Sequence, residues 1–121
     1  MPLMCIQYSE HLPNKQKIKS FVVEAHEYIA SLVNTELNSF KTRIVPVAEF
    51  IVGDGKTDEQ RAVLFVDFRM LPGRTDEVKK QVGDYLLQKA QAAFQEGITR
   101  IQVHIQVQVG QLDAPNYHKN D

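Results

Sequence analysis

Apolar and polar residues alternate along the chain with two different periods, which divide it into strand-like and helix-like segments. The clearest strand covers residues 101–109, where apolar residues occupy every second position and Gln or His fills the positions between. Strict alternation of this kind is typical of a strand with one buried face. Residues 2–9 predict a strand inside a sheet, because they carry apolar side chains on both faces. Residues 61–71 also predict a strand, with one apolar face and a second face that mixes apolar residues with Asp67 and Arg69. Residues 41–52 are rich in β-branched side chains and predict a further strand, in which Pro46 indicates an edge position, a bend or a bulge.

Two other segments repeat their apolar residues every three or four positions, which is the pattern of an amphipathic helix. The first extends from Lys15 to about Asn34, and Asn14 is expected to cap its first turn. The second begins after Thr75, a favourable capping residue that is followed by two acidic residues, and it continues to about Gln95. The sequence therefore predicts two helices of similar length.

The predicted order is β-α-β, a turn and a second β-α-β, in units at about 2–52 and 61–109, followed by a C-terminal arm at 110–121. We therefore predict an α/β (α+β) fold in a single domain, 1–121, with a four-stranded mixed sheet and two helices on one face. Ferredoxin-like domains and the paired βαβ units of the tautomerase superfamily share this order, so element order alone does not separate them. In both, one face of the sheet lacks helices, and apolar side chains there predict oligomerisation.

Size, charge and cysteine content narrow the class of protein. A chain of 121 residues with a formal net charge of −1 has no electrostatic reason to bind nucleic acid or an anionic membrane. Its single cysteine, Cys5, excludes an intrachain disulfide and fits a reducing compartment. No apolar run approaches the roughly 18 residues of a membrane span and no signal peptide is recognisable, so we expect a cytoplasmic protein. The histidines lack ligand spacing, so we expect no metal site.

Pro2 directly follows the first methionine and opens the first predicted strand. A proline is tolerated at a strand's first position because no ladder hydrogen bond is required of it there. A chemical interpretation is also open. If Met1 is removed, Pro2 becomes a secondary amine, and an α-amino group has a pKa of roughly 7.7–8.0, which burial and nearby cations lower. A group of this kind suits acid–base catalysis near neutral pH.

Short motifs spread along the whole chain resemble a known family. "MP" opens the first strand, "YSEHL" ends it, "KTRIV" begins the second strand at Lys41, "PGRTDEVKKQVGDYLL" carries Arg74 into the second helix, and "NYHKND" lies near the C-terminus. In these motifs the chain is similar to the 5-carboxymethyl-2-hydroxymuconate Δ-isomerase family of the tautomerase superfamily. The resemblance favours a tautomerase-like arrangement of the sheet over a ferredoxin-like one.

The resemblance implies a cofactor-independent isomerase of aromatic catabolism, which moves a proton between oxygen and carbon in a 2-hydroxymuconate-like unsaturated keto acid by a 1,3- or 1,5-shift. In that family the N-terminal proline is the acid and base, and cationic side chains hold the substrate's carboxylates. Carried over, Pro2 is the catalytic residue, and Arg74 binds a carboxylate and polarises the developing 2-oxo group. Lys41 and Arg43 match the family's basic pair. Lys41 stands where the family's isomerases carry an arginine, so it keeps the charge but lacks the planar fork.

The resemblance also implies a homotrimer with sites near the subunit interfaces, in which Arg74 acts on a neighbour's proline. Plainer alternatives remain open: Arg74 is also typical of a solvated residue before a helix, and Lys41 with Arg43 of a surface basic pair. Asn116, Tyr117 and Lys119 suit a terminal arm that packs on a neighbour. The whole chain also fits a tautomerase for a different unsaturated keto acid, or a non-catalytic ferredoxin-like oligomer that binds a small ligand. Catalysis further requires removal of the first methionine, because an amide nitrogen is not a base.

Overall fold

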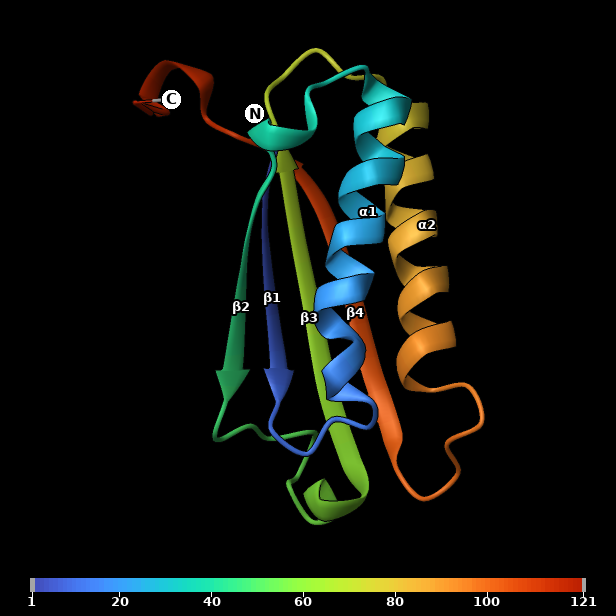
Figure 1. Cartoon of the computed structure of the whole chain (residues 1–121). Coiled ribbons are helices and arrows are strands. Elements are labelled where there is room, and N and C mark those ends of the chain that lie inside the picture. Colours follow the sequence, from blue (N-terminus) through green and yellow to red (C-terminus); the bar gives the residue numbers. More distant parts are fainter. Residues whose placement is uncertain (1, 121) are drawn as a thin grey trace.

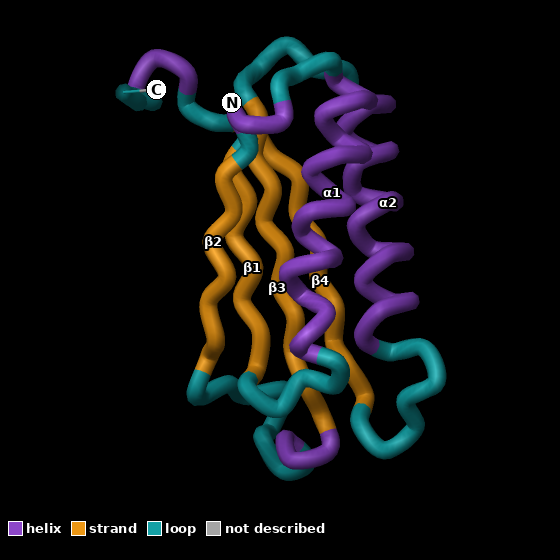
Figure 2. Tube along the Cα trace, in the orientation of Figure 1, coloured by secondary structure: helices purple, strands orange, loops and turns teal. Residues whose placement is uncertain are grey.

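The computed structural model of the chain describes residues 2–120. Its main elements follow the predicted order: β1 (Leu3–Ser9), α1 (Ile18–Val33), β2 (Lys41–Val47), β3 (Arg61–Met70), α2 (Asp76–Phe94) and β4 (Gln102–Gln111). The strands form one four-stranded sheet, and both helices lie side by side on one of its faces (Figure 1). Figure 2 shows the same two layers, with the strands in orange and the helices in purple. The predicted fold class is confirmed.

The strand order β2-β1-β3-β4 separates the two architectures that share this element order. The strands of each βαβ unit are direct neighbours: β1 pairs in parallel with β2, and β3 pairs in parallel with β4. The two units then join through the antiparallel pair β1 and β3. A ferredoxin-like sheet splits each βαβ unit by inserting a strand between its two strands, so this sheet is not ferredoxin-like. The edge position predicted from Pro46 is confirmed, since β2 lies at one edge.

The hydrophobic core fills the space between the sheet and the two helices. Every second residue of β3 enters it, from Ala62 to Met70, and each is at most 3% exposed. The helices meet these side chains with the apolar stripes that their periodicity predicted, and Phe21 of α1 contacts Phe94 of α2 edge to face at 5.8 Å. Because successive side chains of a strand point to opposite faces, this burial fixes which residues remain on the other face.

The ends of three elements depend on hydrogen bonds. Thr75 caps α2 as predicted, because its hydroxyl oxygen accepts a hydrogen bond from the Val78 N–H at 3.2 Å. The prediction that Asn14 caps the first helix is wrong. Asn14 has a positive φ of 60°, and its side-chain N–H donates to the carbonyl of Ala93 instead. A 3₁₀ turn (Lys15–Lys17) therefore precedes α1. β2 ends at Val47 rather than at residue 52, because its partner strand β1 also ends there.

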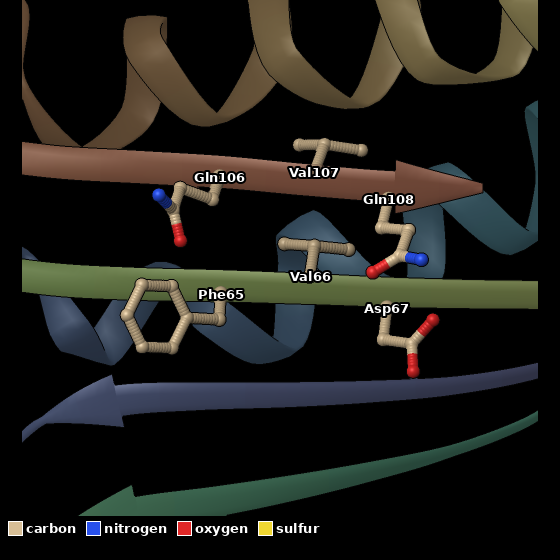
Figure 3. Close-up of a pocket in the computed structure, with 6 residues that line it drawn as sticks. All are labelled: Phe65, Val66, Asp67, Gln106, Val107 and Gln108. Carbon is tan, nitrogen blue, oxygen red and sulfur yellow. The ribbon is translucent and has the colours of Figure 1, made fainter.

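The other face of the sheet, which we call the open face, is covered by no helix among residues 2–120 (Figure 1). Its side chains form rows across β2, β1, β3 and β4: Lys41–Leu3–Arg69–Gly110, Arg43–Cys5–Asp67–Gln108 and Val45–Gln7–Phe65–Gln106. In Figure 3, Phe65 and Asp67 project to the side of the sheet opposite the helices, and so do the glutamines of β4, whereas Val66 and Val107 project toward the helices. Of the helices that the structure describes, none combines the length and apolar character needed to cross a membrane.

Candidate active site

Pro2 is buried directly before β1, at the end of the sheet where β2 begins and β3 ends. Its carbonyl oxygen accepts a hydrogen bond from the backbone N–H of Lys41 at 3.3 Å. A proline nitrogen has no hydrogen to donate, so the ladder holds this residue through its carbonyl alone. Met1, whose removal would turn the nitrogen into an amine, lies outside the described residues.

Lys41 and Arg43 lie on the edge strand β2, and both point to the open face. Their positions follow from register, because Lys41 is opposite Leu3 and Arg43 is opposite Cys5. Lys41 is exposed, and its Nζ donates a hydrogen bond to the carbonyl oxygen of Asn38 at 3.0 Å. Arg43 is also exposed, one row further from Pro2's end of the sheet.

The residue between this basic pair, Thr42, points the other way and anchors β2 to α1. Its hydroxyl lies 2.6 Å from Nε2 of His26, whose ring also packs against Phe40 with centroids 5.2 Å apart. Burial lowers the pKa of His26 below its ordinary value, because a partly enclosed imidazolium loses hydration. The neutral ring of His26 therefore fixes the strand that carries the basic pair.

Arg74 lies in the exposed loop that connects β3 to α2. One of its guanidinium nitrogens, Nη2, is 3.4 Å from the hydroxyl of Thr35, directly after α1. This loop and the start of β2 lie at the same end of the sheet as the N-terminus (Figure 1). The fold therefore brings Pro2, Lys41 and Arg74 to one end of the sheet, and it places Arg43 beside them on the open face.

Two further charged residues of β3 lie on the open face among these groups. Arg69 is opposite Leu3, and Asp67 is opposite Cys5. Nε of Arg69 lies 3.4 Å from Oδ1 and 3.3 Å from Oδ2 of Asp67, and Nη2 lies 3.3 Å from Oδ2. Sequence reasoning placed both residues on the mixed face of their strand but assigned neither to the site. The signal that identifies them is register, because β1 separates them from Arg43 by a single strand.

Arg43, Asp67 and Arg69 are the charged residues that line a hollow of about 340 Å³ on the open face. It is lined by Leu3, Met4, Cys5, Arg43, Asp67, Arg69 and Leu112. A second hollow of about 520 Å³ lies over β3 and β4, where Phe65, Gln106 and Gln108 line it together with Asp67 (Figure 3). Both volumes fall within the range of about 300–1,000 Å³ that is usual for small-molecule sites. Asp67 lines both hollows.

The segment that follows β4 contains another residue singled out from the sequence. Asn116 donates a hydrogen bond to the carboxylate of Asp113 at 2.8 Å, within the segment that follows β4. That segment extends beyond the end of the sheet, away from the two helices (Figure 1). Within residues 2–120, no group of three or more His, Cys, Asp or Glu side chains is arranged to hold a metal ion.

The fold belongs to the tautomerase class, as solved structures of similar shape show. A 5-carboxymethyl-2-hydroxymuconate isomerase from Deinococcus radiodurans R1 has a TM-score of 0.84 and 15% identity, with 99% of this chain and 89% of that chain covered. A 5-carboxymethyl-2-hydroxymuconate delta-isomerase has a TM-score of 0.80 and 15% identity, over 100% and 89% of the two chains. A fused 4-OT protein, described as a symmetric trimer, has a TM-score of 0.62 and 18% identity, over 98% and 93%.

The sequence itself identifies the family. The family model described as 5-carboxymethyl-2-hydroxymuconate isomerase matches residues 2–121, so this chain belongs to that family. No curated protein sequence matched the chain significantly. Family and fold together support an isomerase or tautomerase. The resemblance that the short motifs carried is confirmed.

Proposed function

We propose that this protein catalyses enol–keto isomerisation of a 2-hydroxymuconate-like unsaturated keto acid without a cofactor, with Pro2 as acid and base. The observation that carries the proposal is the burial of Pro2 at the sheet end where Lys41 pairs with it, with Arg43 one row further along the open face. A buried base suits proton transfer, and surrounding cations suit an anionic dicarboxylate. We place this activity in the cytoplasmic catabolism of aromatic compounds.

The reaction needs one group that removes a proton from oxygen and returns one to carbon. After removal of Met1, the nitrogen of Pro2 takes the 2-hydroxyl proton of the dienol. The O–H electrons form the C=O bond, the conjugated double bonds shift by one position, and the distal carbon takes a proton from the prolinium. The amine is thereby regenerated, so the cycle consumes no co-reactant. The rigid pyrrolidine ring fixes the direction of the lone pair throughout.

The cationic residues divide the binding task. Arg74 pairs with the carboxylate next to the 2-oxo group and polarises that oxygen, since a guanidinium offers two parallel N–H donors. Arg43 and Lys41 attract the carboxylate at the other end of the substrate from the open face. Because Lys41 is a point charge without a fork, it contributes attraction rather than orientation.

We further propose a homotrimer in which neighbouring copies cover the open face and complete each site. Exposed apolar side chains support it: Val45 on the open face of the edge strand is 37% exposed, and Ile51 in the loop after β2 is 78% exposed. In such an assembly Arg74 serves the Pro2 of an adjacent subunit.

Turnover by matched proline variants tests the function. Wild-type protein, Pro2→Ala and Pro46→Ala are assayed with 2-hydroxymuconate and with phenylenolpyruvate, after intact mass has established whether the first methionine is absent. Pro2→Ala is expected to lower kcat by about 10²–10⁴-fold, the usual contribution of a general acid–base group. Pro46→Ala changes a proline at the far end of β2 and is expected to keep wild-type activity.

Three results would overturn the proposal or its base. Wild-type rates no higher than in buffer for both substrates would exclude the isomerase and favour a small-ligand binding protein. A native mass that retains the methionine would exclude Pro2 as the base. Turnover of phenylenolpyruvate alone would favour a tautomerase for a different unsaturated keto acid.

A further inference from the structure

The 340 Å³ hollow on the open face begins one residue from Pro2. Leu3 forms part of its wall, and Arg69 lies directly opposite Leu3 on the antiparallel strand β3. Residues opposite one another in an antiparallel pair have Cα atoms about 4.5–5.5 Å apart. The side chain of Arg69 therefore leaves β3 beside Leu3, the residue that directly follows Pro2. The hollow therefore starts one residue along the chain from the proposed base.

The charges around the hollow favour an anion. Two guanidinium groups, those of Arg43 and Arg69, and one carboxylate, that of Asp67, line it, which gives a net charge of +1. The Arg69 and Asp67 side chains are 52% and 41% exposed, so their ion pair contributes little to stability. The pair has a geometric consequence instead. Asp67 holds Nε and Nη2 of Arg69, and a guanidinium with five N–H donors then keeps donors for a second carboxylate.

We propose that Arg69 is a further substrate-binding residue, which binds the carboxylate of a dicarboxylate substrate far from the reacting oxygen, and that Asp67 is its positioning residue. This inference rests on the proposed isomerase function and deepens it. It accounts for the lysine at position 41, because the planar fork that Lys41 lacks is present on Arg69, in the same row across the sheet. Arg69 thus determines specificity for substrates with two well-separated carboxylates over those with one.

Kinetics with two substrates separate this role from a structural one. KM and kcat are measured with 2-hydroxymuconate, which has two carboxylates, and with phenylenolpyruvate, which has one. Arg69→Ala is expected to raise KM for the dicarboxylate about 10- to 100-fold, the usual effect of losing a charge-assisted hydrogen-bond pair, and to change KM for the monocarboxylate less than about twofold. Arg69→Lys is expected to recover part of the loss. Arg100→Ala is the matched control and is expected to have wild-type kinetics. Arg100 is exposed just before the start of β4, at the other end of the sheet from Pro2.

Variants of Asp67 test the positioning role. Asp67→Asn is expected to raise KM for the dicarboxylate several-fold with kcat unchanged, because Arg69 loses its orientation, and Asp67→Glu is expected to restore most of the affinity. A lower KM in Asp67→Asn would show that Asp67 repels the substrate and would overturn the positioning role. Equal effects of Arg69→Ala on the two substrates would overturn the specificity role.

Binding of an unreactive dicarboxylate distinguishes failure of this inference from failure of the proposed function. Adipate is titrated calorimetrically into wild type, Arg69→Ala and Arg100→Ala. If wild type and Arg100→Ala bind adipate and Arg69→Ala does not, the binding role of Arg69 is supported. This holds even if wild type turns over neither substrate, a result that would exclude the isomerase. Unchanged adipate affinity and unchanged KM in Arg69→Ala, with wild-type turnover intact, would overturn the role of Arg69 and leave the isomerase standing.

Discussion

The two faces of β3 differ in what covers them, and so they contribute to different properties of the protein. On the helix side, Leu64 and Phe68 are fully buried in the core. On the open face, Phe65 and Asp67 are half-buried and Arg69 is exposed. Because neighbouring residues of a strand point to opposite sides, one strand supplies both the core and the candidate site. Substitutions on the open face of β3 can therefore alter the candidate site while the core on the other face stays intact.

Phe68→Ala is expected to have the largest effect on this comparison. Phe68 is fully buried and contacts Phe40, so truncation is expected to lower the free energy of unfolding by about 3–5 kcal/mol, measured by urea denaturation. Phe65→Ala removes the same atoms from the open face and is expected to cost less. If a second copy covers Phe65, as proposed, its cost should also depend on protein concentration. Equal losses that do not change on dilution would refute the distinction between the faces.

Phe65→Glu is expected to weaken assembly at least about tenfold, because the interface would have to bury an unpaired carboxylate. Sedimentation velocity over a range of concentrations measures the shift toward monomer. Val23→Glu is the control, since Val23 is 54% exposed on α1 and the helices cover the other side of the sheet. If Phe65→Glu assembles like wild type, the open face is not the interface between copies.

The smallest expected effect is a pH dependence of the folding stability, caused by His26 on the helix side of the sheet. Its folded pKa lies below the value of about 6.5 for an unfolded chain, because burial disfavours the imidazolium. The unfolded state therefore binds more protons below pH 6.5. The stability that the neutral ring contributes is complete above that pH and is lost as the pH falls through the folded pKa. His26→Gln is expected to keep a bond to Thr42 and to show a flatter decline in Tm from pH 7 to pH 5.

His118→Gln is the control for this measurement, since His118 is exposed in the segment after β4. It is expected to follow the wild-type profile. A parallel decline of His26→Gln and wild type would mean that His26 does not cause the pH dependence.

The sequence predicted the elements and their faces well because both depend on local periodicity. The alternation in residues 101–109 and the three- to four-residue spacing in the helices are set by neighbours in the chain, and the core confirms them. The cap at Thr75 was equally predictable, because a side chain and the N–H three residues later need no distant partner. The motifs supplied the family, which the match over residues 2–121 confirms.

The features that sequence reasoning missed depend on distant partners. β2 ends where β1 ends, and no pattern within residues 41–52 records the length of another strand. Asn14 bonds to Ala93 on the second helix, which competes with capping of the first. Arg69 joins the candidate site because β1 aligns it with Leu3, so its place is a property of the sheet register.

The hydrogen bond between the N–H of Lys41 and the carbonyl of Pro2 bears on how the N-terminus could be processed. The sheet holds Pro2 through its carbonyl group. Its nitrogen carries no hydrogen and donates no hydrogen bond to the sheet. Cleavage on the N-terminal side of that nitrogen therefore does not touch the bond between Lys41 and Pro2. If Pro2 is the base, as proposed, removal of Met1 would activate it while this hydrogen bond stays in place.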